Sequence, residues 1–373
     1  MKGYVRKRGD KWSYTVDIGK DPITGKRKQK TKSGFKTKKE AETALNELVY
    51  EVNNGSWIAP KELTFKEFSL DWYESYKYKL KETTSEQYSI KINKWINPFF
   101  GNNKIQEIKP VHGQAFVSKL LDSLQPDTAH KVLSVAKMIF KHAVHLEIIS
   151  KSPLENITIS NPKNKKKNTW SFEELNHFLN ITKKYDEFYY DVFTVAAFTG
   201  LRKGEVMGLR RIDPDFSKNI INIRQSITET KKGVQIGLLK TPSSYRKVAI
   251  DSFVSSILKE RINKNNAYRL KFGPEYQDNG LIFCHPDGKP FRPTSLNRPF
   301  RKYINIAGVP KIRFHDMRHT HATLLLELNT NPKIVADRLG HSSVKITLDT
   351  YSHASIGLQS DVANVFSKKV NEK

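Results

Sequence analysis

The first fifty residues change from a strand-like to a helix-like pattern of hydrophobic positions. Between residues 4 and 31, apolar side chains occupy alternate positions, at Trp12, Tyr14, Val16 and Ile18. Residues 21–25 (Asp-Pro-Ile-Thr-Gly) have the composition of a turn, so this stretch predicts a hairpin. Apolar residues then recur at helical spacing over residues 38–53. We therefore predict a small three-stranded sheet backed by one helix.

Residues 64–150 contain only helical patterns. Thr64 is a suitable N-cap for a first helix, and further helices are predicted over residues 82–96, 111–124 and 126–146. Within the last of these, helical spacing assigns four apolar residues to a core: Val132, Val135, Ile139 and Val144. The pattern predicts an all-helical unit.

The remainder of the chain mixes helices with short strands. Residues 171–174 (Ser-Phe-Glu-Glu) have the sequence of a capping box, and residues 191–198 are apolar enough to form a buried helix. Strand-like runs follow at 220–223, 234–238, 248–250 and 280–283. We predict a mainly helical unit with a small antiparallel sheet.

Two breaks in these patterns divide the chain. Residues 55–60 interrupt the helical repeat, and residues 160–168 contain no apolar side chain, which is typical of a tether. We therefore predict three domains, over residues 1–55, 62–155 and 168–373. The predicted fold class is a multidomain α+β protein.

Composition adds a strong positive charge to this picture. The 373 residues include 64 Lys and Arg against 38 Asp and Glu, which gives a formal charge of +26. An excess of this size favours a polyanionic partner that is bound through counterion release. A membrane surface is disfavoured, because the sequence has no long apolar span and no basic amphipathic anchor.

Compartment and cysteine content narrow the possibilities further. The N-terminus is charged but lacks the apolar core of a secretion signal, so we expect a cytoplasmic protein. Cys284 is the only cysteine, which excludes an intrachain disulfide and a thiolate metal cluster. We assign it a packing role within a strand.

Basic residues concentrate in two segments. The N-terminal hairpin carries Lys26, Arg27, Lys28 and Lys30, and the tether carries Lys165, Lys166 and Lys167. Basic strands can enter a DNA groove, and a basic tether can contact phosphates. We predict that both segments contact DNA. The alternative, a solvated charged hairpin, is disfavoured by the crowding of charge in so short a segment.

A candidate anion site lies near the C-terminus. Asp316 is a good N-cap residue, so we predict that a helix begins there. His315 and Arg318 are three residues apart and would face one pocket at the helix start, where backbone N–H groups favour a phosphate. This segment alone is equally consistent with a solvated surface patch.

A second segment brings further chemistry. Asn331 and Pro332 are typical of a helix start and Gly340 of a helix end, so His341 would lie just beyond a helix. A tyrosine, Tyr351, follows. Its hydroxyl has a pKa near ~10, so it is a poor nucleophile unless cations stabilise its anion and the leaving oxygen is protonated.

These motifs together resemble a known family. His315-x-x-Arg318, then Leu-Gly-His341, then Tyr351 are similar in order and spacing to the active-site signature of tyrosine recombinases, the phage-integrase family. Residues 199–205 (Thr-Gly-Leu-Arg-Lys-Gly-Glu) resemble the first catalytic box of that family. The N-terminal segment is similar to the arm-binding domain of many integrases.

The resemblance implies how the phosphate would be held. Arg202 and Arg318 would grip the non-bridging oxygens of the scissile phosphate with their forked donors. Glu205 would brace the pocket and transfer no proton. Taken alone, the spacing of Arg202 and Glu205 is more typical of a local salt bridge.

The resemblance also implies the proton and strand transfers. Tyr351 would attack and become linked to the 3′-phosphate, and His315 would assist its proton transfer. Lys240 would protonate the leaving 5′-oxygen, although its spacing does not separate it from neighbouring lysines. His341 would donate a hydrogen bond to the phosphate.

The implied function is site-specific integration and excision of a phage or conjugative element. We expect no cofactor and no metal, because the sequence has neither a Gly-rich phosphate loop with its lysine nor a paired acidic cluster. The implied partners are double-stranded DNA at core and arm attachment sites, three further copies in a homotetramer, and accessory DNA-bending or excision-directing proteins. Residues 354–366 would dock on their own chain or on a neighbouring subunit.

Three other functions are weighed against this one. A metal enzyme could use His315 and His319, but no glutamate lies between them and Arg318 would repel a cation. A DNA-binding regulator without catalysis would leave the catalytic boxes unexplained. A type IB topoisomerase shares the tyrosine strategy, but the separate basic N-terminal module fits an integrase better.

Overall fold

The computed structural model describes residues 3–20, 27–53, 63–160, 168–239, 241–351 and 367. The chain divides into two compact units, Met1–Lys163 and Asn164–Lys373. The first unit contains two separate hydrophobic clusters, one in the strand-rich segment and one in the helical segment that follows. The predicted boundaries of three domains remain a prediction.

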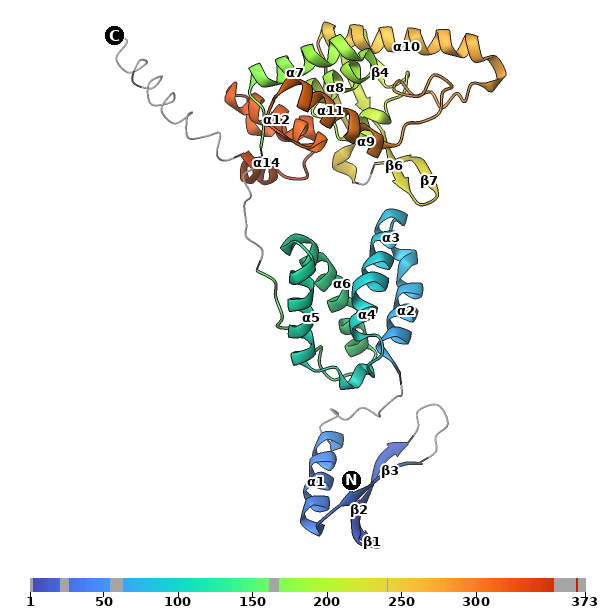
Figure 1. The fold of residues 1–373 in the computed structure, drawn as a ribbon, viewed down its shortest axis with the longest axis vertical. Helices are drawn as coiled ribbons and strands as arrows, with labels where there is room; N and C mark the ends of the chain where they lie inside the picture. Colours follow the sequence, from blue (N-terminus) through green and yellow to red (C-terminus); the bar gives the residue numbers. More distant parts are fainter. Residues whose placement is uncertain are drawn as a thin grey trace. The chain divides into compact units, whose positions relative to one another are not determined.

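The N-terminal segment is a three-stranded antiparallel meander covered by one helix (Figure 1). Its elements are β1 (Gly3–Arg8), β2 (Lys11–Lys20), β3 (Arg27–Phe35) and α1 (Lys38–Asn53). Tyr14 and Val16 of β2 pack against Leu45 and Leu48 of α1. The predicted sheet and helix are confirmed, while the predicted turn at 21–25 lies outside the described residues.

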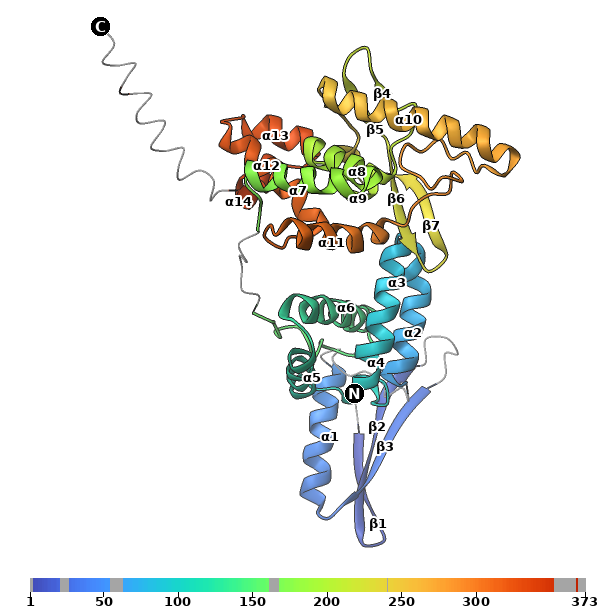
Figure 2. The ribbon, with the colours of Figure 1, turned by 45° about the horizontal axis from the view of Figure 1, so that its top comes forward.

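The next segment is entirely helical, as predicted (Figures 1 and 2). Its helices are α2 (Phe65–Tyr76), α3 (Glu82–Lys91), α4 (Asn97–Phe100), α5 (Pro110–Ser123) and α6 (Pro126–His145), with shorter turns η1 (Lys77–Lys79), η2 (Ile92–Ile96) and η3 (Ile105–Glu107). Thr64 caps α2 as predicted, because its hydroxyl accepts from the backbone N–H of Glu67 at 3.3 Å. Buried aromatic rings fill the centre: Phe65, Phe100, Phe116 and Phe140.

The C-terminal unit is mainly helical and holds the largest core. Its helices are α7 (Phe172–Tyr185), α8 (Glu187–Thr199), α9 (Lys203–Met207), α10 (Ser252–Phe272), α11 (Asn297–Ala307), α12 (Phe314–Glu327), α13 (Pro332–Leu339) and α14 (Val344–Tyr351), with turns η4 (Pro242–Ser244), η5 (Gly273–Glu275) and η6 (Pro293–Leu296). Ser171 caps α7 in the predicted capping box. Aromatic residues of α7, α8 and α11 meet at the core: Phe178, Phe193 and Phe300.

Two small antiparallel sheets accompany these helices. One is β4 (Pro214–Asp215), β5 (Ile220–Ile223) and β8 (Arg246–Ala249), and the other is the hairpin β6 (Gln225–Thr230) and β7 (Gly233–Leu238). Sequence patterning found β5, β7 and β8 but missed β4 and β6. The predicted strand at 280–283 is wrong, because only isolated bridges form there, at Leu281 and Cys284. Cys284 is buried with a free thiol, so its packing role holds but its strand does not.

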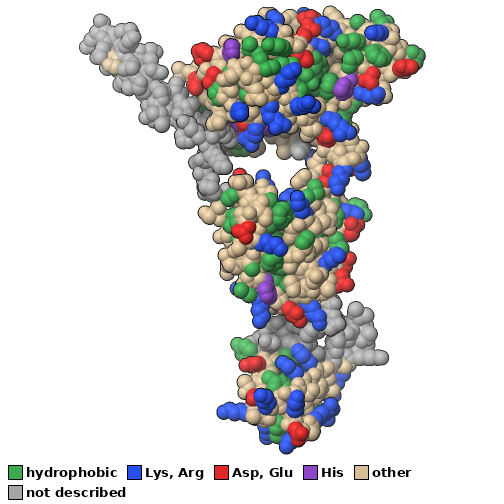
Figure 3. All heavy atoms as spheres, viewed as in Figure 1, with side chains coloured by type: hydrophobic (Ala, Val, Ile, Leu, Met, Phe, Trp, Pro, Cys, Tyr) green, Lys and Arg blue, Asp and Glu red, His purple; other side chains and the backbone are tan. Residues whose placement is uncertain are grey.

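The surface carries the basic charge that the composition predicts. On the face drawn in Figure 3, Lys and Arg side chains are spread over the N-terminal, central and C-terminal parts of the chain, with Asp and Glu between them. None of the helices that the structure describes combines the length and the apolar character needed to cross a bilayer.

Candidate active site

The first candidate segment lies where α8 ends and α9 begins. Gly200 ends α8 in the left-handed region, with φ of 64°. A Cβ at this position would approach the side chains of His321 and Leu339 to 2.6 Å, so both the backbone and the packing require glycine. Arg202 then occupies the N-cap position of α9, and its side chain is partly exposed.

The second candidate segment is the first turn of α12. The helix begins at Phe314 with Arg313 as its N-cap, so the predicted cap at Asp316 is wrong. Asp316 lies in the first turn, where its carboxylate accepts from the backbone N–H of Arg313 at 2.8 Å. An acidic residue at this position satisfies an orphan donor just as a capping residue does, which explains the error. His315 and Arg318 lie on the same turn.

The third candidate segment joins α13 to α14. The Asn331 side chain caps α13, and Gly340 ends it with φ of 67°, as predicted. His341 follows, and its Nδ1 lies 2.8 Å from the hydroxyl of Thr347 in α14. A helix end, a turn and a second helix therefore fix the imidazole.

These three segments meet at one cleft of about 550 Å³. Four predicted site residues line it: Arg202, His315, Arg318 and His341. The other described lining residues are Thr241, Ser243, Arg313, His319, Gly340, Ser342 and Ile346. None of these described lining residues is Asp or Glu, so the cleft presents guanidinium, imidazole and hydroxyl groups to an incoming anion.

Arg318 is fixed at this cleft by the backbone on two sides. Its side chain is only 3% exposed, and it donates to the carbonyl of Gly200 at 2.9 Å and to that of Leu339 at 2.5 Å. These carbonyls belong to the ends of α8 and α13. The guanidinium therefore holds together the three helix ends that form the cleft.

The local electrostatics keep His315 neutral in the free protein. The side chain is exposed in the cleft, yet the surrounding protein removes part of its hydration and thereby lowers its pKa, and repulsion from Arg318 lowers it further. At neutral pH the ring can therefore accept a proton. It meets the ring of His319 edge-on, with centroids 5.2 Å apart.

Glu205 joins two arginines beneath the cleft. Its carboxylate accepts from Arg202 Nη1 at 2.8 Å and from Arg246 Nη2 at 2.9 Å. Burial by itself would raise the pKa of this carboxyl, but Arg246 and then Arg202 outweigh burial and leave the pKa lowered. The predicted salt bridge between Arg202 and Glu205 is therefore present, and the bracing role of Glu205 stays a prediction.

Models of three protein families match successive parts of the chain. The phage integrase family matches residues 168–356, an arm DNA-binding domain matches residues 4–52, and the phage integrase N-terminal SAM-like domain matches residues 64–121. The chain belongs to the phage integrase family, the tyrosine recombinases. The resemblance seen in the motifs is thereby confirmed.

Relatives of this integrase extend over nearly its whole length. A protein named tyrosine recombinase XerC-like, from Caldanaerobacter subterraneus subsp. tengcongensis, is 30% identical and covers 94% of each chain. The ICEBs1 integrase of Bacillus subtilis is 27% identical, covering 96% of this chain and 98% of its own. The relatives also include integrases of phages and prophages.

Solved structures share the fold. The Tn1549 transposon integrase in complex with a circular intermediate DNA aligns with a TM-score of 0.69 at 20% identity, covering 83% of this chain and 99% of that one. A lambda integrase tetramer bound to a Holliday junction aligns with a TM-score of 0.60 at 16% identity, covering 93% and 94%. The predicted fold class is confirmed.

Several predicted residues of the integrase lie outside the described residues or are described only in part. Lys240, Lys26, the tether lysines 165–167 and the tail 354–366 are outside them, and for Lys28 and Tyr351 only the backbone is described. Tyr351 is the last residue of α14, the helix that contributes Ile346 to the cleft.

The two remaining hairpin residues differ in position. Arg27 is exposed and donates to Asp17 at 2.6 Å. Lys30 pairs with Val16, and directly paired residues of an antiparallel sheet share a face, so Lys30 lies on the side covered by α1. DNA contact by Arg27 and by Lys30 stays a prediction.

Sequence reasoning missed two arginines that do not line the cleft but make hydrogen bonds to residues beside it. Arg246 is buried beside Glu205, and Arg338 donates to His321 Nε2 at 3.1 Å. Neither arginine stands out in the sequence, because the chain contains many other basic residues. The available signal for Arg246 was the polar run that it ends, residues 241–246. Thr241 and Ser243 of this run line the cleft, and a loop in such a place must be held by side-chain contacts.

His321, which accepts the hydrogen bond from Arg338, allows a test of these buried contacts. Burial, followed by repulsion from Arg338 and Arg318, lowers its pKa to about 3, while a backbone hydrogen bond with Ala197 opposes the shift. The unfolded state binds the proton near pH 6.5 and the folded state does not. Stability is therefore complete above that pH and falls as the pH drops toward 3.

The expected loss between pH 7 and pH 5 is about 2 kcal/mol of unfolding free energy from this histidine alone. His321→Gln, whose amide oxygen can still accept from Arg338, should lose less stability over the same interval. Denaturant unfolding of both proteins at the two pH values measures the difference. Equal losses would contradict the burial of a neutral ring.

Among the described residues, no three His, Cys, Asp or Glu side chains converge to hold a metal ion.

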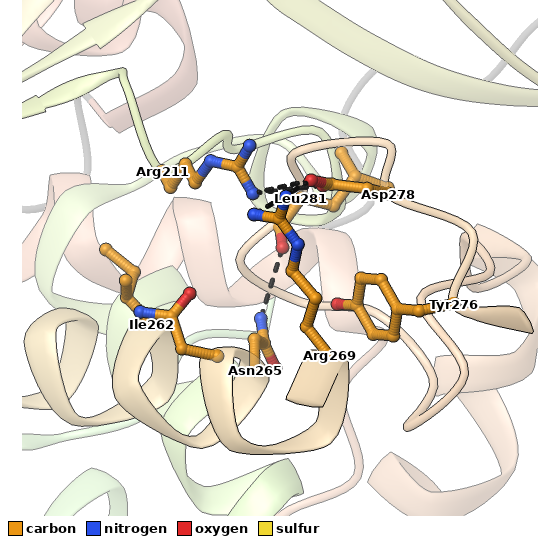
Figure 4. A pocket seen from close by; sticks show the side chains of 8 residues that line it. Arg211, Ile262, Asn265, Arg269, Tyr276, Asp278 and Leu281 are labelled. Carbon is orange, nitrogen blue, oxygen red and sulfur yellow. Dashed lines mark hydrogen bonds and ion pairs between the residues drawn. The ribbon is translucent and has the colours of Figure 1, made fainter. Parts of the chain in front are cut away.

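A smaller hollow beside α10 is lined by Arg211, Asn265, Tyr276 and Asp278. Figure 4 shows Arg211 and Arg269 both turned toward Asp278, whose carboxylate compensates part of their charge.

Proposed function

We propose that this integrase cuts and rejoins double-stranded DNA at specific sites through a 3′-phosphotyrosyl intermediate, and so integrates and excises a phage or conjugative element. One observation carries the proposal. Arg202, His315, Arg318 and His341 come from three separate segments and line the same cleft. A scissile phosphate is the anion that this set of donors suits.

The two arginines would neutralise the phosphate. Each guanidinium can give two parallel hydrogen bonds to non-bridging oxygens, a geometry that an ammonium does not reproduce. The carbonyl bonds of Arg318 orient its side chain before DNA arrives. Such preorganisation lowers the barrier, because no rearrangement is needed as charge develops on the phosphate.

Tyr351 would be the nucleophile. It lies about 7.5 Å beyond Ile346 along α14, at 1.5 Å per residue. Its oxygen would form a bond to phosphorus as the bond from phosphorus to the 5′-oxygen breaks. Neutral His315 would accept the phenolic proton, Lys240 would give a proton to the leaving oxygen, and His341 would donate to the phosphate.

The rejoining step would reverse these transfers. The phosphotyrosyl bond conserves the energy of the original phosphodiester, so an incoming 5′-hydroxyl can displace the tyrosine without ATP. Glu205 would hold Arg202 in place and take no part in proton transfer.

The wider assembly is part of the same proposal. Residues 1–55 would bind arm sites, with Arg27 and its neighbours on the DNA, and residues 62–155 would cover the core site opposite residues 168–373. Lysines 165–167 would contact phosphates between those two domains. Four copies would act together in the cytoplasm, with accessory proteins setting the direction; the lambda integrase tetramer on a Holliday junction supports the copy number.

A trapping experiment tests the proposal. A duplex spanning the junction of the element that carries the gene is nicked beside the expected crossover, so that cleavage releases a short strand and prevents rejoining. We expect a detergent-stable adduct in the presence of EDTA, with the 3′-phosphate attached to a peptide that contains Tyr351.

Other outcomes would contradict the proposal in distinct ways. Tight DNA binding without an adduct would indicate a regulator. An adduct that EDTA abolishes would indicate a metal enzyme. Relaxation of supercoiled DNA that lacks the junction sequence would indicate a topoisomerase.

A further inference from the structure

Arg246, the first residue of β8, makes three hydrogen bonds from a buried position. Its side chain is 6% exposed. Nε donates to the carbonyl of Arg338 at 2.7 Å, Nη1 to that of Ser244 at 3.0 Å, and Nη2 to Glu205 at 2.9 Å. The two bonds to carbonyls fix the plane of the guanidinium. The third bond pairs its positive charge with the carboxylate of Glu205.

Arg338 returns the contact from the other side. It belongs to the last turn of α13, and its Nη1 donates to the carbonyl of Ala249, at the end of β8, at 2.8 Å. Its Nη2 donates to the carbonyl of Phe198 in α8, also at 2.8 Å. Each arginine thus binds the backbone of the element that carries the other, which locks β8 to α13.

Glu205 is consequently shared between two guanidiniums. Arg246 Nη2 and the backbone N–H of Arg202 both donate to Oε2, while the Arg202 guanidinium contacts Oε1 with Nη1 only and directs Nη2 toward the carbonyl of Gly340 at 3.4 Å. A carboxylate with both oxygens available binds arginine in a parallel, two-point manner. Without Arg246, one acceptor position of Oε2 would be open, so the Arg202 guanidinium could bind Glu205 with two nitrogens and move away from the cleft.

We propose that Arg246 is a positioning residue: by donating to Oε2 of Glu205, it leaves the Arg202 guanidinium with one nitrogen on that carboxylate and keeps it turned toward the phosphate. This inference rests on the proposed function, because Arg202 is the group through which it acts. Arg246 itself is not among the residues that line the cleft.

The test is single-turnover cleavage of the nicked duplex by Arg246→Met and Arg246→Lys. Met fills similar volume but leaves Oε2 without a cation, so cleavage should fall about 100-fold, the cost of a misplaced contact group. Lys restores the charge at Glu205 but not the carbonyl bonds, so it should recover most of the rate. Equal loss in both variants would overturn the proposal.

A double-mutant cycle separates positioning from general destabilisation. In an Arg202→Lys background, Arg246→Met should cost little further rate, because a lysine offers no two-point contact for Glu205 to capture. The same 100-fold loss in both backgrounds would assign Arg246 a purely structural role. If Arg246→Met does not fold, Arg246→Leu, which also removes the donor to Oε2, takes its place with the same expected loss.

Arg261→Met is the matched control. Arg261 is also buried and paired with a carboxylate, that of Asp191, but it joins α10 to α8 and does not line the cleft. It shows what destabilisation alone does to the rate, and we expect cleavage below the melting temperature to stay near that of the wild type.

Inorganic phosphate gives a readout that does not require turnover. It should raise the melting temperature of the wild type more than that of Arg246→Met, because only the former presents Arg202 to the anion. Equal shifts would contradict the inference. An inactive wild-type protein that still shows the difference would contradict the proposed function while leaving the inference intact.

Discussion

Tyr351→Phe is expected to reduce strand cleavage at least about 10⁴-fold, because it removes the only oxygen that the mechanism uses as nucleophile. Affinity for junction DNA should not change, since the arginines, the imidazoles and the basic surface remain. Adduct formation on the nicked duplex measures the first effect, and a gel shift at fixed salt measures the second. Retained cleavage would remove Tyr351 from the mechanism.

A matched tyrosine and a mixing experiment sharpen this result. Tyr268→Phe makes the same change on the surface of α10 and should cleave normally. Because Ile346 and Tyr351 share α14, we expect the tyrosine to serve the cleft of its own chain. A mixture of Tyr351→Phe with Arg318→Lys should then cleave no faster than Arg318→Lys alone, whereas faster cleavage would show that a neighbouring subunit supplies the nucleophile.

Arg318→Lys should slow cleavage by about 10² to 10³, equivalent to the loss of one donor from an oxyanion site. Lysine keeps the charge but has a single nitrogen. It cannot donate to the carbonyls of Gly200 and Leu339 and also give two parallel hydrogen bonds to the phosphate. Single-turnover rates at saturating protein measure the loss in chemistry separately from binding.

The control for this prediction is Arg211→Lys. Arg211 also binds oxygen acceptors, because its Nη1 contacts both oxygens of Asp278 at 3.0 Å, but it does not line the cleft. Its cleavage rate should match the wild type. A wild-type rate in Arg318→Lys would show that charge alone, and not guanidinium geometry, serves at this position.

Local signals in the sequence predicted much of the fold. Thr64, Ser171 and Asn331 cap helices as expected, because a capping side chain acts on backbone groups two or three residues away. The alternating apolar residues of β2 and the helix-ending Gly340 are local signals of the same kind. Errors arose where the local signal was ambiguous, as at Asp316, whose carboxylate can serve the start of a helix from either of two positions.

Long-range contacts could not be predicted in this way. β6 has few apolar residues and becomes a strand by pairing with β7. Only the first half of α10 contributes to the core, at Val254, Ile257 and Leu258, so its hydrophobic repeat is weak. Likewise, nothing in the sequence around Arg246 distinguishes a buried guanidinium from the solvated ones, because its partners lie 41 and 92 residues away.

The separate hydrophobic clusters within the described residues have a practical consequence for redirecting the enzyme. The strand-rich segment closes around Tyr14, Val16, Leu45 and Leu48, and the catalytic helices close around a different set of side chains. Neither cluster needs the other to be complete. If residues 1–55 bind arm sites as proposed, a different DNA-binding module could therefore replace them without any change to the core of the C-terminal helices.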